Sequence, residues 1–541
     1  MRATHETTVL TKTAFELLVA MYRERGYRDR DIPELILTKN LAGMEIDPRA
    51  AQISGLALAM RARELDRRFF RRGVRADIAV LRPVTFEEGE LPEGCALAKK
   101  RDLLDALAHL DEVGSLLRPD RTDLAAIREA IALCGDGAGG LFAATAASKL
   151  ERALGVCEKL ARSFDCVVAN PPYMGSSSFG PFMSKWVKKS YPDVKSDLFS
   201  SFVVRMFNLA KDHGECGVMS PFVWMFIGSY EKLRTEIIDN RTLTSLIQLE
   251  YSGFAGATVP ICTYTFHNSF IKGYKGGYVR LSDFVGASVQ APKALEAIRN
   301  PDCGWFYRRD AETFKQIPGT PIAYWVSDGL LNAFEVGPLV KEVPVKKGLD
   351  TGDNDRFLRY WHEVDFGNFG IGYDSARSFF QSGSKWAPHD KGGDFRKWYG
   401  NNDWVINWGS DGKELKASSA NLRSPQFYFQ KAVTWSALSS GRPGFRLSDQ
   451  GALSNTAGSS MFPEEKSISP VLAYMNSSVV LRALELLAPT LNYSAGPVGS
   501  VPLMSDDIDG CSEISDECVS ISKSDWDSFE TSWNFKRHPL I

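Results

Sequence analysis

Phe164-Asp165-Cys166-Val167-Val168-Ala169-Asn170-Pro171-Pro172-Tyr173 is the stretch of the sequence that decides the fold. Its first six residues form a short, mainly apolar run of β-forming residues, which predicts a strand covered by helices on both faces. Polar and proline residues follow directly at the carboxyl end of this strand. Open α/β sheets bind ligands outside the carboxyl ends of their strands, so this turn is the first candidate site.

The tetrapeptide Asn170-Pro171-Pro172-Tyr173 has the groups needed to hold a planar amino group. The Asn170 side-chain oxygen and the Pro171 carbonyl can accept hydrogen bonds from the two N–H groups of that amino group and so return electron density to the nitrogen. Neither proline has an N–H, so the backbone is stiff and offers no competing donor. Tyr173 adds a flat face on which a planar base can stack. A plain Pro-Pro turn after a strand would also fit these four residues, so the surrounding sequence has to agree.

An acidic turn lies on an earlier predicted strand, Leu41–Ile46. A carboxylate at a strand end can accept hydrogen bonds from two ribose hydroxyls, and we assign this task to Glu45. Ile46 is placed to cover one face of an adenine ring. Asp47 and Pro48 are instead read as the N-cap and first residue of a helix.

Helices and strands alternate around these two turns, which favours a doubly wound sheet with a terminal antiparallel hairpin. The predicted helices are Thr11–Arg25, Asp31–Thr38, Arg49–Arg72, Leu198–Lys211 and Tyr230–Asp239. The predicted strands are Leu41–Ile46, Ala76–Leu81, Phe164–Ala169, Gly217–Pro221, Ser245–Leu249 and Ile261–Phe266. Residues 99–163 read as a helical insertion. From about residue 340 aromatic, Gly and Asn residues become dense, which predicts a second domain of short strands and loops with a late helix at Val471–Leu487.

Composition excludes several classes of protein. The 541 residues are 44% hydrophobic and 24% charged, which is typical of a folded chain and not of a disordered one. No run of about 18 apolar residues exists, so no membrane span is predicted, and without a signal pattern we expect a cytoplasmic protein. The nine cysteines form no CxxC pair, so no metal site is expected.

The net charge is −2, yet the basic residues are unevenly placed. The segment Leu422–Arg446 interleaves basic and aromatic residues and has no acid, which predicts contacts with nucleic-acid phosphates and bases. Its residues are Arg423, Lys431, Arg442 and Arg446, with Phe427, Tyr428, Phe429, Trp435 and Phe445. A solvated loop over an aromatic core is the alternative. Lys185, Lys188 and Lys189 follow the tetrapeptide and would either grip a nucleic-acid backbone or solvate a mobile loop.

These features resemble the N6-adenine DNA methyltransferases whose cofactor motifs precede a catalytic Asn-Pro-Pro-Tyr. Glu45 matches the ribose-binding acid of that family, and Asn170, Pro171, Pro172 and Tyr173 match its catalytic residues. Phe254 falls where the family places a second aromatic against the target base, although an ordinary core Phe would fit equally well. Four further segments resemble the PglX methyltransferases of BREX phage-defence systems: 348–357, 392–401, 492–496 and 525–533.

The resemblance implies a Rossmann-like sheet that uses S-adenosyl-L-methionine, in residues 1–270 with the insertion at about 99–163. A connecting segment, 271–339, and a mixed, mostly β target-recognition domain, 340–541, would follow. It further implies site-specific methylation of adenine in double-stranded DNA, in phage defence or restriction-modification. Other proteins of the defence system are implied as partners.

One departure from the family affects the cofactor site. A glycine-rich loop should precede the helix Thr11–Arg25, but residues 4–8 read Thr-His-Glu-Thr-Thr. We therefore expect a fragment that lacks the glycine-rich motif and the family's C-terminal part. Two alternatives stay open: a catalytically inactive DNA-recognition fragment, and a methyltransferase acting on protein glutamine or RNA.

Overall fold

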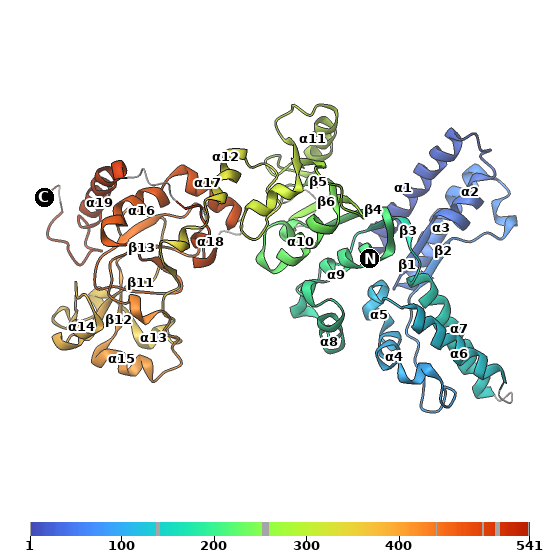
Figure 1. Cartoon of the computed structure of the whole chain (residues 1–541), viewed down its shortest axis with the longest axis horizontal. Helices are drawn as coiled ribbons and strands as arrows, with labels where there is room; N and C mark the ends of the chain where they lie inside the picture. The colour runs from blue at the N-terminus through green and yellow to red at the C-terminus, as the bar shows by residue number, and fades with distance from the viewer. Residues whose placement is uncertain are drawn as a thin grey trace. The chain divides into compact units, whose positions relative to one another are not determined.

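The computed structural model describes residues 2–136, 141–251, 259–439, 441–488, 492–503, 509–538 and 540. The chain divides into two compact units (Figure 1). The first comprises Met1–Trp224 and Thr235–Arg308, and the second comprises Met225–Arg234 and Arg309–Ile541. Each unit has hydrophobic clusters of its own.

The first unit begins with two packed helices, α1 (Arg2–Glu24) and α3 (Pro48–Leu65). Between them come α2 (Ile32–Leu35), a π-helix (Ile36–Asn40) and β1 (Ala42–Glu45), and β1 pairs in parallel with β2 (Asp77–Val80). Asp47 caps α3 as predicted, because its carboxylate accepts a hydrogen bond from the Arg49 N–H at 2.8 Å. The predicted helix to residue 72 is too long: α3 stops at Asp66, whose carboxylate accepts from the Arg68 N–H and Arg72 Nε.

The insertion is helical, as predicted, and consists of α4 (Arg101–Ala108), α5 (Leu110–Val113), α6 (Arg121–Asp136) and α7 (Leu141–Leu160). Helices α6 and α7 pack against each other along their lengths (Figure 1). Leu103, Ile127 and Leu150 point inward and are almost completely buried. The insertion therefore has a small core of its own.

A six-stranded mixed sheet forms the rest of the first unit, in the order β3-β4-β6-β5-β7-β8. Its strands are β3 (Phe164–Ala169), β4 (Ala210–Pro221), β5 (Thr242–Gln248), β6 (Ile261–His267), β7 (Lys275–Arg280) and β8 (Phe306–Asp310). Pairs β3–β4 and β5–β7 are parallel, while β6 runs antiparallel to both β4 and β5. The predicted antiparallel hairpin is thus β5–β6, but it is not terminal, because β7 and β8 continue the sheet beyond β5. Helices α9 (Leu198–Leu209) and α10 (Glu231–Asn240) connect the strands as expected.

Strand β3 differs from the prediction in its burial. It was expected to be covered on both faces, yet Cys166 is exposed and Val168 is 56% exposed. The reason is non-local pairing: β3 is an edge strand bonded only to β4, and β1 with β2 forms a separate two-stranded sheet. The described residues therefore form a mixed α/β unit with two sheets, not one continuous doubly wound sheet.

The second unit contains two four-stranded sheets, β10-β12-β11-β15 and β14-β13-β16-β9. The strands are short: β9 (Val345–Lys346), β10 (Leu358–Tyr360), β11 (Trp386–Asp390), β12 (Trp404–Asn407), β13 (Ala432–Trp435), β14 (Phe445–Ser448), β15 (Leu453–Ser454) and β16 (Ser460–Met461). The helices are α11 (Ala287–Arg299) in the first unit, and α12 (Asp328–Glu335), α13 (Asn354–Phe357), α14 (Ala376–Ser382) and α15 (Gly409–Lys416) in the second. The short strands and loops predicted for this part of the chain are present, but the domain is not mostly β, because it also contains helices α13, α14 and α15, which were not predicted.

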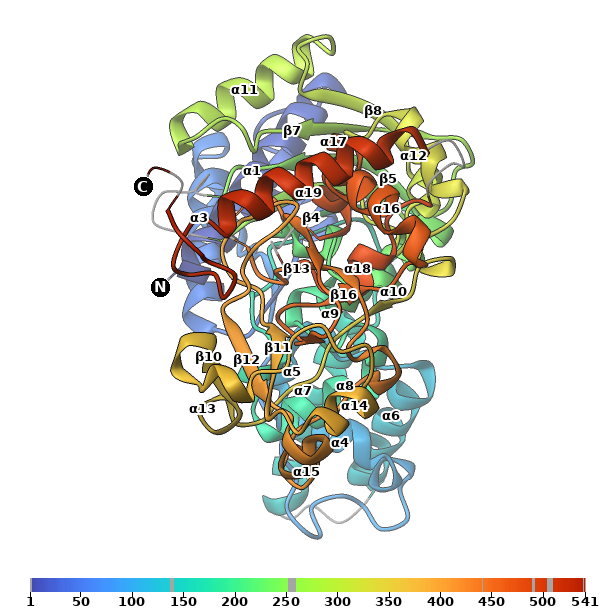
Figure 2. The same cartoon turned by 90° about the vertical axis from the view of Figure 1, so that its left-hand side faces the viewer.

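The late helix predicted at Val471–Leu487 is two helices, α16 (Ile468–Met475) and α17 (Ser478–Leu487). The break has a local cause. Ser477 caps α17 by accepting from the Val480 N–H, and Asn476 Nδ2 donates to the Phe445 carbonyl at 3.0 Å. Helix α19 (Ser512–Trp526) packs on α16 (Figure 2).

Neither a membrane span nor a metal cluster occurs among the described residues. None of the helices in these ranges is both long and apolar enough to cross a bilayer. No three His, Cys, Asp or Glu side chains in the same ranges gather into a possible metal site. The nine cysteines are free thiols.

Candidate functional site

The tetrapeptide leaves β3 at its carboxyl end, as predicted. Pro171 is buried, Pro172 is exposed and Tyr173 is 37% exposed. The Tyr173 hydroxyl donates a hydrogen bond to Asn170 Oδ1 at 3.0 Å. Asn170 Oδ1, the expected acceptor for a substrate amino group, therefore already accepts a hydrogen bond. A bound amino group would replace the Tyr173 hydroxyl as the donor.

The backbone after the tetrapeptide is fixed to the start of α9. The Leu198 N–H donates to the Met174 carbonyl at 2.9 Å, and the Ser176 N–H donates to the Ser196 carbonyl at 3.0 Å. Asp197 caps α9 by accepting from the Phe199 N–H. Burial raises the pKa of Asp197, an effect that backbone N–H donors partly oppose. Strand β3 on one side and α9 on the other therefore hold the turn in place.

Uncharged groups lie near the tetrapeptide on strands β4 and β6. Tyr264 is almost fully buried, packs on Trp224 with 4.8 Å between ring centroids, and its hydroxyl accepts a hydrogen bond from Ser220 Oγ at 3.4 Å. Burial raises the pKa of Tyr264, and Tyr173 adds to the effect electrostatically. Burial also raises the pKa of the Cys262 thiol to about 12, so it stays neutral. Such surroundings suit a neutral planar substrate better than a charged one.

Glu45 and Ile46 lie at the carboxyl end of β1. The Glu45 carboxylate is partly exposed and accepts from the Asp47 N–H at 3.0 Å, while Ile46 is 47% exposed. The helical insertion reaches this point, because a Cβ added to Gly114 would lie 3.1 Å from Ile46 Cγ2. A carboxylate and an apolar side chain are therefore presented together where the ribose and ring of an adenosine were predicted.

Arg205 is a buried cation on α9 that the sequence pattern did not reveal, and it links α9 to the helical insertion. Its Nε donates to the Ser115 carbonyl at 2.6 Å and its Nη2 donates to the Leu160 carbonyl at 2.5 Å. Burial lowers the pKa of Arg205 to about 10, so the side chain remains charged at neutral pH. An arginine in an apolar helix was the only available signal. Its role is to tie α9 to the segment that contacts Ile46.

Replacing Arg205 by Ala should lower the free energy of unfolding of the first unit by about 3 kcal/mol, because two buried carbonyls lose their donor. Chemical denaturation followed by tryptophan fluorescence measures this change. Arg128→Ala is the matched control, since Arg128 forms an exposed pair with Glu158 at 2.7 Å. Its cost should be about 0–1 kcal/mol. Equal stabilities of the two variants would contradict the assigned role of Arg205.

The lysines after the tetrapeptide lie on a helix, α8 (Pro181–Ser190), not on a loop. Lys189 pairs with Asp102 at 2.7 Å, whereas Lys185 and Lys188 are exposed about one turn apart. Lys185 and Lys188 thus present two positive charges to solvent on one side of α8. Phe254, the predicted second aromatic, lies outside the described residues.

Four of the five predicted aromatic residues of the segment 422–446 lie in the core, whereas Phe427 is half-buried and stacks on Phe462. Tyr428 and Phe429 belong to one buried cluster, and Trp435 and Phe445 belong to another. Arg446 is only 2% exposed, so it cannot contact a phosphate as predicted. Burial lowers the pKa of Arg446 to about 10, an effect that Asp390 opposes. A basic residue between apolar ones in a strand usually indicates an exposed face. Here β13 and β14 are buried on both faces, so Arg446 is buried as well.

Three of the predicted basic contacts remain at the surface. Arg423 is half-buried and donates to Thr456 Oγ1 at 3.2 Å. Lys431 precedes β13 and is exposed, and Arg442 lies in the turn between β13 and β14, where it is 3.9 Å from Glu485. The antiparallel pairing of β13 and β14 places Lys431 and Arg442 at opposite ends of this hairpin.

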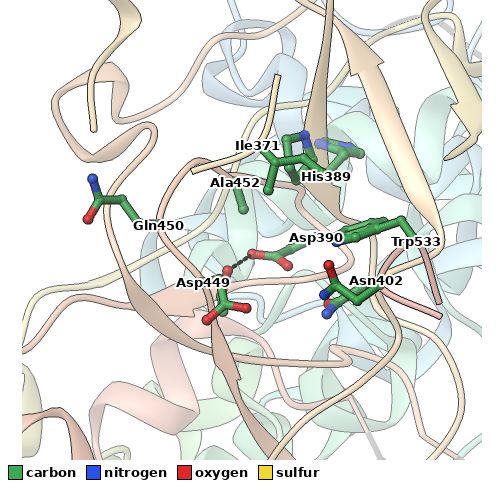
Figure 3. Close-up of a pocket in the computed structure, with 11 residues that line it drawn as sticks. Ile371, His389, Asp390, Asn402, Asp449, Gln450, Ala452 and Trp533 are labelled. Atoms are coloured by element: carbon green, nitrogen blue, oxygen red, sulfur yellow. Dashed lines mark hydrogen bonds between the residues drawn. The ribbon is translucent and has the colours of Figure 1, made fainter. Parts of the chain in front are cut away.

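Another feature absent from the sequence analysis is a small polar cavity of about 60 Å³ in the second unit (Figure 3). Its lining includes Asp390 and His389 from β11. Ser448 Oγ donates to Asp390 Oδ2 at 2.6 Å, and burial raises the pKa of Asp390 to about 6. Burial lowers the pKa of His389 to about 3. The cavity has room for only a few water molecules, so we assign it to the polar interior of the unit.

Comparisons with known proteins agree with these geometric features. The family model for the Eco57I restriction-modification methylase matches residues 39–254. Adenine-specific methyltransferase BrxX of Escherichia coli O9:H4 (strain HS) is 36% identical over 98% of this chain and 46% of the relative. Adenine-specific methyltransferase PglX of Lacticaseibacillus casei (strain Zhang) is 31% identical over the same shares. The chain therefore spans about half the length of the curated relatives it matches.

Among solved structures, a nuclease-deletion mutant of the Type ISP restriction-modification enzyme LlaGI in complex with a DNA substrate mimic aligns with a TM-score of 0.49. It shares 12% identity and covers 95% of this chain and 43% of that chain. The resemblance predicted from sequence motifs is confirmed by the curated relatives across nearly the whole chain.

Proposed function

We propose, from its relationship to the adenine-specific methyltransferases BrxX and PglX, that this chain carries the catalytic and target-recognition parts of a site-specific DNA N6-adenine methyltransferase. Its reaction would transfer a methyl group to adenine in double-stranded DNA, within a BREX phage-defence or restriction-modification system of the cytoplasm. The observation that carries this proposal is the Asn170 amide oxygen at the end of β3, held by the Tyr173 hydroxyl at 3.0 Å.

In this mechanism the target adenine leaves the DNA stack, at a cost of a few kcal/mol, and enters beside the tetrapeptide. Asn170 Oδ1 and the Pro171 carbonyl accept hydrogen bonds from its amino group, and Tyr173 stacks on its ring. The lone pair of that amino group is delocalised into the ring, and the two acceptors return electron density to the nitrogen and so make it more nucleophilic. The tetrapeptide forms no covalent intermediate, so positioning supplies most of the rate enhancement.

S-adenosyl-L-methionine would supply the methyl group when bound. Glu45 and Ile46 fit its adenosine half, because a partly exposed carboxylate and an exposed apolar side chain lie side by side at the end of β1. The methionine half has no matching backbone cradle in the described residues before β1, where residues 2–24 form helix α1. The described residues therefore match the adenosine half of the cofactor but not its methionine half.

The finer architecture belongs to the same proposal. The two sheets of the first unit would be parts of a Rossmann-like sheet interrupted by the insertion at 99–163, and β7 and β8 extend that sheet beyond the expected boundary at residue 270. The connecting segment would then be shorter than the expected 271–339, and a target-recognition domain, 340–541, would follow it. Parallel pairing of β1 with β2 and of β3 with β4 supports this reading.

DNA binding through the second unit predicts a change in salt dependence. Lys431→Ala or Arg442→Ala should weaken binding to a fluorescent DNA duplex and reduce the slope of log affinity against log salt by about 1 for each residue in contact. Fluorescence anisotropy across roughly 50 to 200 mM salt measures that slope. Because these residues lie at opposite ends of the β13–β14 hairpin, the single variants also tell which end faces DNA.

Lys466→Ala is the matched control for these variants, since Lys466 is 83% exposed in the same unit and lies 3.5 Å from Glu464. It should leave the slope unchanged. Unchanged slopes for both Lys431→Ala and Arg442→Ala would assign the hairpin to the solvated surface and remove it from the DNA contacts.

The inactive DNA-recognition fragment is a second candidate, favoured by the continuous helix α1 where a glycine-rich loop was expected. It predicts duplex binding without methyl transfer. Methylation of protein glutamine or RNA has less support, because a second unit of this size exceeds what a short peptide requires. Competition of unlabelled duplex RNA against labelled duplex DNA tests the RNA alternative, and stronger binding of RNA would favour it.

A further inference from the structure

The segment 392–401 of the second unit has an unusually strained backbone. Gly392, Gly393 and Gly400 have positive φ, and so do Trp398 (71°) and Asn401 (64°), which carry side chains. Left-handed backbone is unfavourable for a residue with a bulky side chain such as Trp398 and persists only where the surroundings enforce it. Gly400 is required mainly by its φ of 117°, and an added Cβ would also lie in tight contact, 3.0 Å from Arg396 Cδ and Trp526 Cε3.

The surroundings do enforce this conformation. Trp398 pairs with β14 through two backbone hydrogen bonds of 2.8 Å, one with Phe445 and one with Leu447. Asn401 Nδ2 donates to the Asp394 carbonyl at 2.8 Å. Four further hydrogen bonds join the segment to residues outside it. Ser436 Oγ donates to the Gly393 carbonyl, and Lys397 Nζ donates to the Asn476 carbonyl. The Tyr399 hydroxyl donates to Asp449 and accepts from Lys523 Nζ. These hydrogen bonds therefore hold the backbone of the segment 392–401 in place.

This rigid segment presents an aromatic side chain to solvent. Phe395 is 60% exposed at its tip, between the exposed residues Asp394 and Arg396. The Arg396 guanidinium rests over the Trp526 ring at 4.8 Å, which fixes its position beside Phe395. Singly exposed aromatic rings are common at protein surfaces, so the informative feature is that the backbone around this ring is fixed. Here the enforced backbone keeps it outside.

The charge around the ring favours a polyanion as its occupant. Residues 391–401 contain Lys391, Arg396 and Lys397 against one acid, Asp394. Lys397 Nζ is bonded to the Asn476 carbonyl, and Asp403 interacts with Arg396. Lys391 and Arg396 therefore remain as the cations available to an anionic ligand. Apolar side chains flanked by cations can insert between base steps, unstack them and kink the duplex. Aromatic rings stack on bases of any sequence in the same way. A protein partner would fit the ring but not this charge.

We propose that Phe395 is a wedge that stacks against bases of the bound DNA, with Arg396 on the adjacent phosphate. The proposal deepens the DNA binding proposed above and rests on it. Phe395 would then help to distinguish DNA sequences by how readily their base steps unstack, without a hydrogen bond to any base.

The test compares Phe395→Ala and Phe395→Trp with Phe380→Ala on a fluorescein-labelled duplex of random sequence. Phe380, on α14 of the same unit, is 56% exposed and is the matched control. We expect Phe395→Ala to weaken binding about tenfold without changing the salt slope, because it removes stacking and no charge. Phe395→Trp should restore the affinity, and Phe380→Ala should leave it unchanged.

Permanganate, which oxidises unstacked thymines, supplies a second readout on the same complexes. Thymines should become reactive in DNA bound by the parent chain or by Phe395→Trp, but not by Phe395→Ala. Parent-like affinity and thymine reactivity in Phe395→Ala, measured on a parent chain that does bind DNA, would overturn the wedge and leave the proposed function intact. Failure of the parent chain to bind the duplex would instead overturn the DNA-binding function itself.

Discussion

Asn170→Ala is expected to reduce methyl transfer about a thousandfold or more in a chain that also carries the family's glycine-rich loop, because it removes a preorganised acceptor from the reacting amino group. Affinity for DNA should stay within about twofold, since Asn170 acts only after the base has left the stack. The measurement is single-turnover transfer of a tritiated methyl group to duplex DNA, with affinity measured in parallel by anisotropy.

Two matched variants sharpen this expectation. Tyr173→Phe keeps the stacking face and removes only the hydroxyl that donates to Asn170 Oδ1, so it should retain most of the rate. Asn240→Ala changes an asparagine at the end of α10 whose side chain donates to Glu236, and it should behave like the parent. If Asn170→Ala methylated DNA at a rate near that of the parent, the tetrapeptide would not be the catalytic element.

Local signals explain why so much of the first unit could be predicted. The apolar run of β3 ends at Ala169 in both sequence and structure, because the following Pro171 and Pro172 cannot continue a paired strand. Asp47 with Pro48 predicted the start of α3 for an equally local reason: the cap needs only one side-chain oxygen and the next N–H groups. Glu45 and Asn170 follow from these ends, since each comes directly at the end of its strand.

Long-range pairing decides the features that the sequence did not reveal. The exposure of Val168 depends on which strand pairs with β3, and the strand's own composition carries no information on that choice. Arg446 looks like any other basic residue, yet it sits on a strand paired with β13 and against Trp398, so it is buried. The strain at Trp398 is likewise invisible in the sequence, because it arises from contacts with β14 and with Lys523 through Tyr399.

The chain as given should bind S-adenosylmethionine weakly, with a dissociation constant above about 100 μM, equivalent to a binding free energy weaker than about −5.5 kcal/mol. The methionine half of the cofactor needs a backbone that passes within hydrogen-bond distance, which favours residues without Cβ. Residues 3–13 contain no glycine, and the β-branched Thr7, Thr8 and Val9 disfavour positive φ. The structure places residues 2–24 in one continuous helix, whose backbone N–H groups beyond the first turn are used internally.

Isothermal titration of the purified chain with S-adenosylmethionine and, separately, with adenosine tests this expectation. If Glu45 and Ile46 provide all of the binding, the two ligands should bind with affinities within about threefold, since the methionine half then adds almost nothing. Glu45→Ala should abolish the residual heat for both ligands, whereas Glu64→Ala, on the exposed side of α3, should not change it. A low-micromolar dissociation constant for S-adenosylmethionine, well below that for adenosine, would show that residues other than those before β1 cradle the methionine half, and the chain would then have a complete cofactor site.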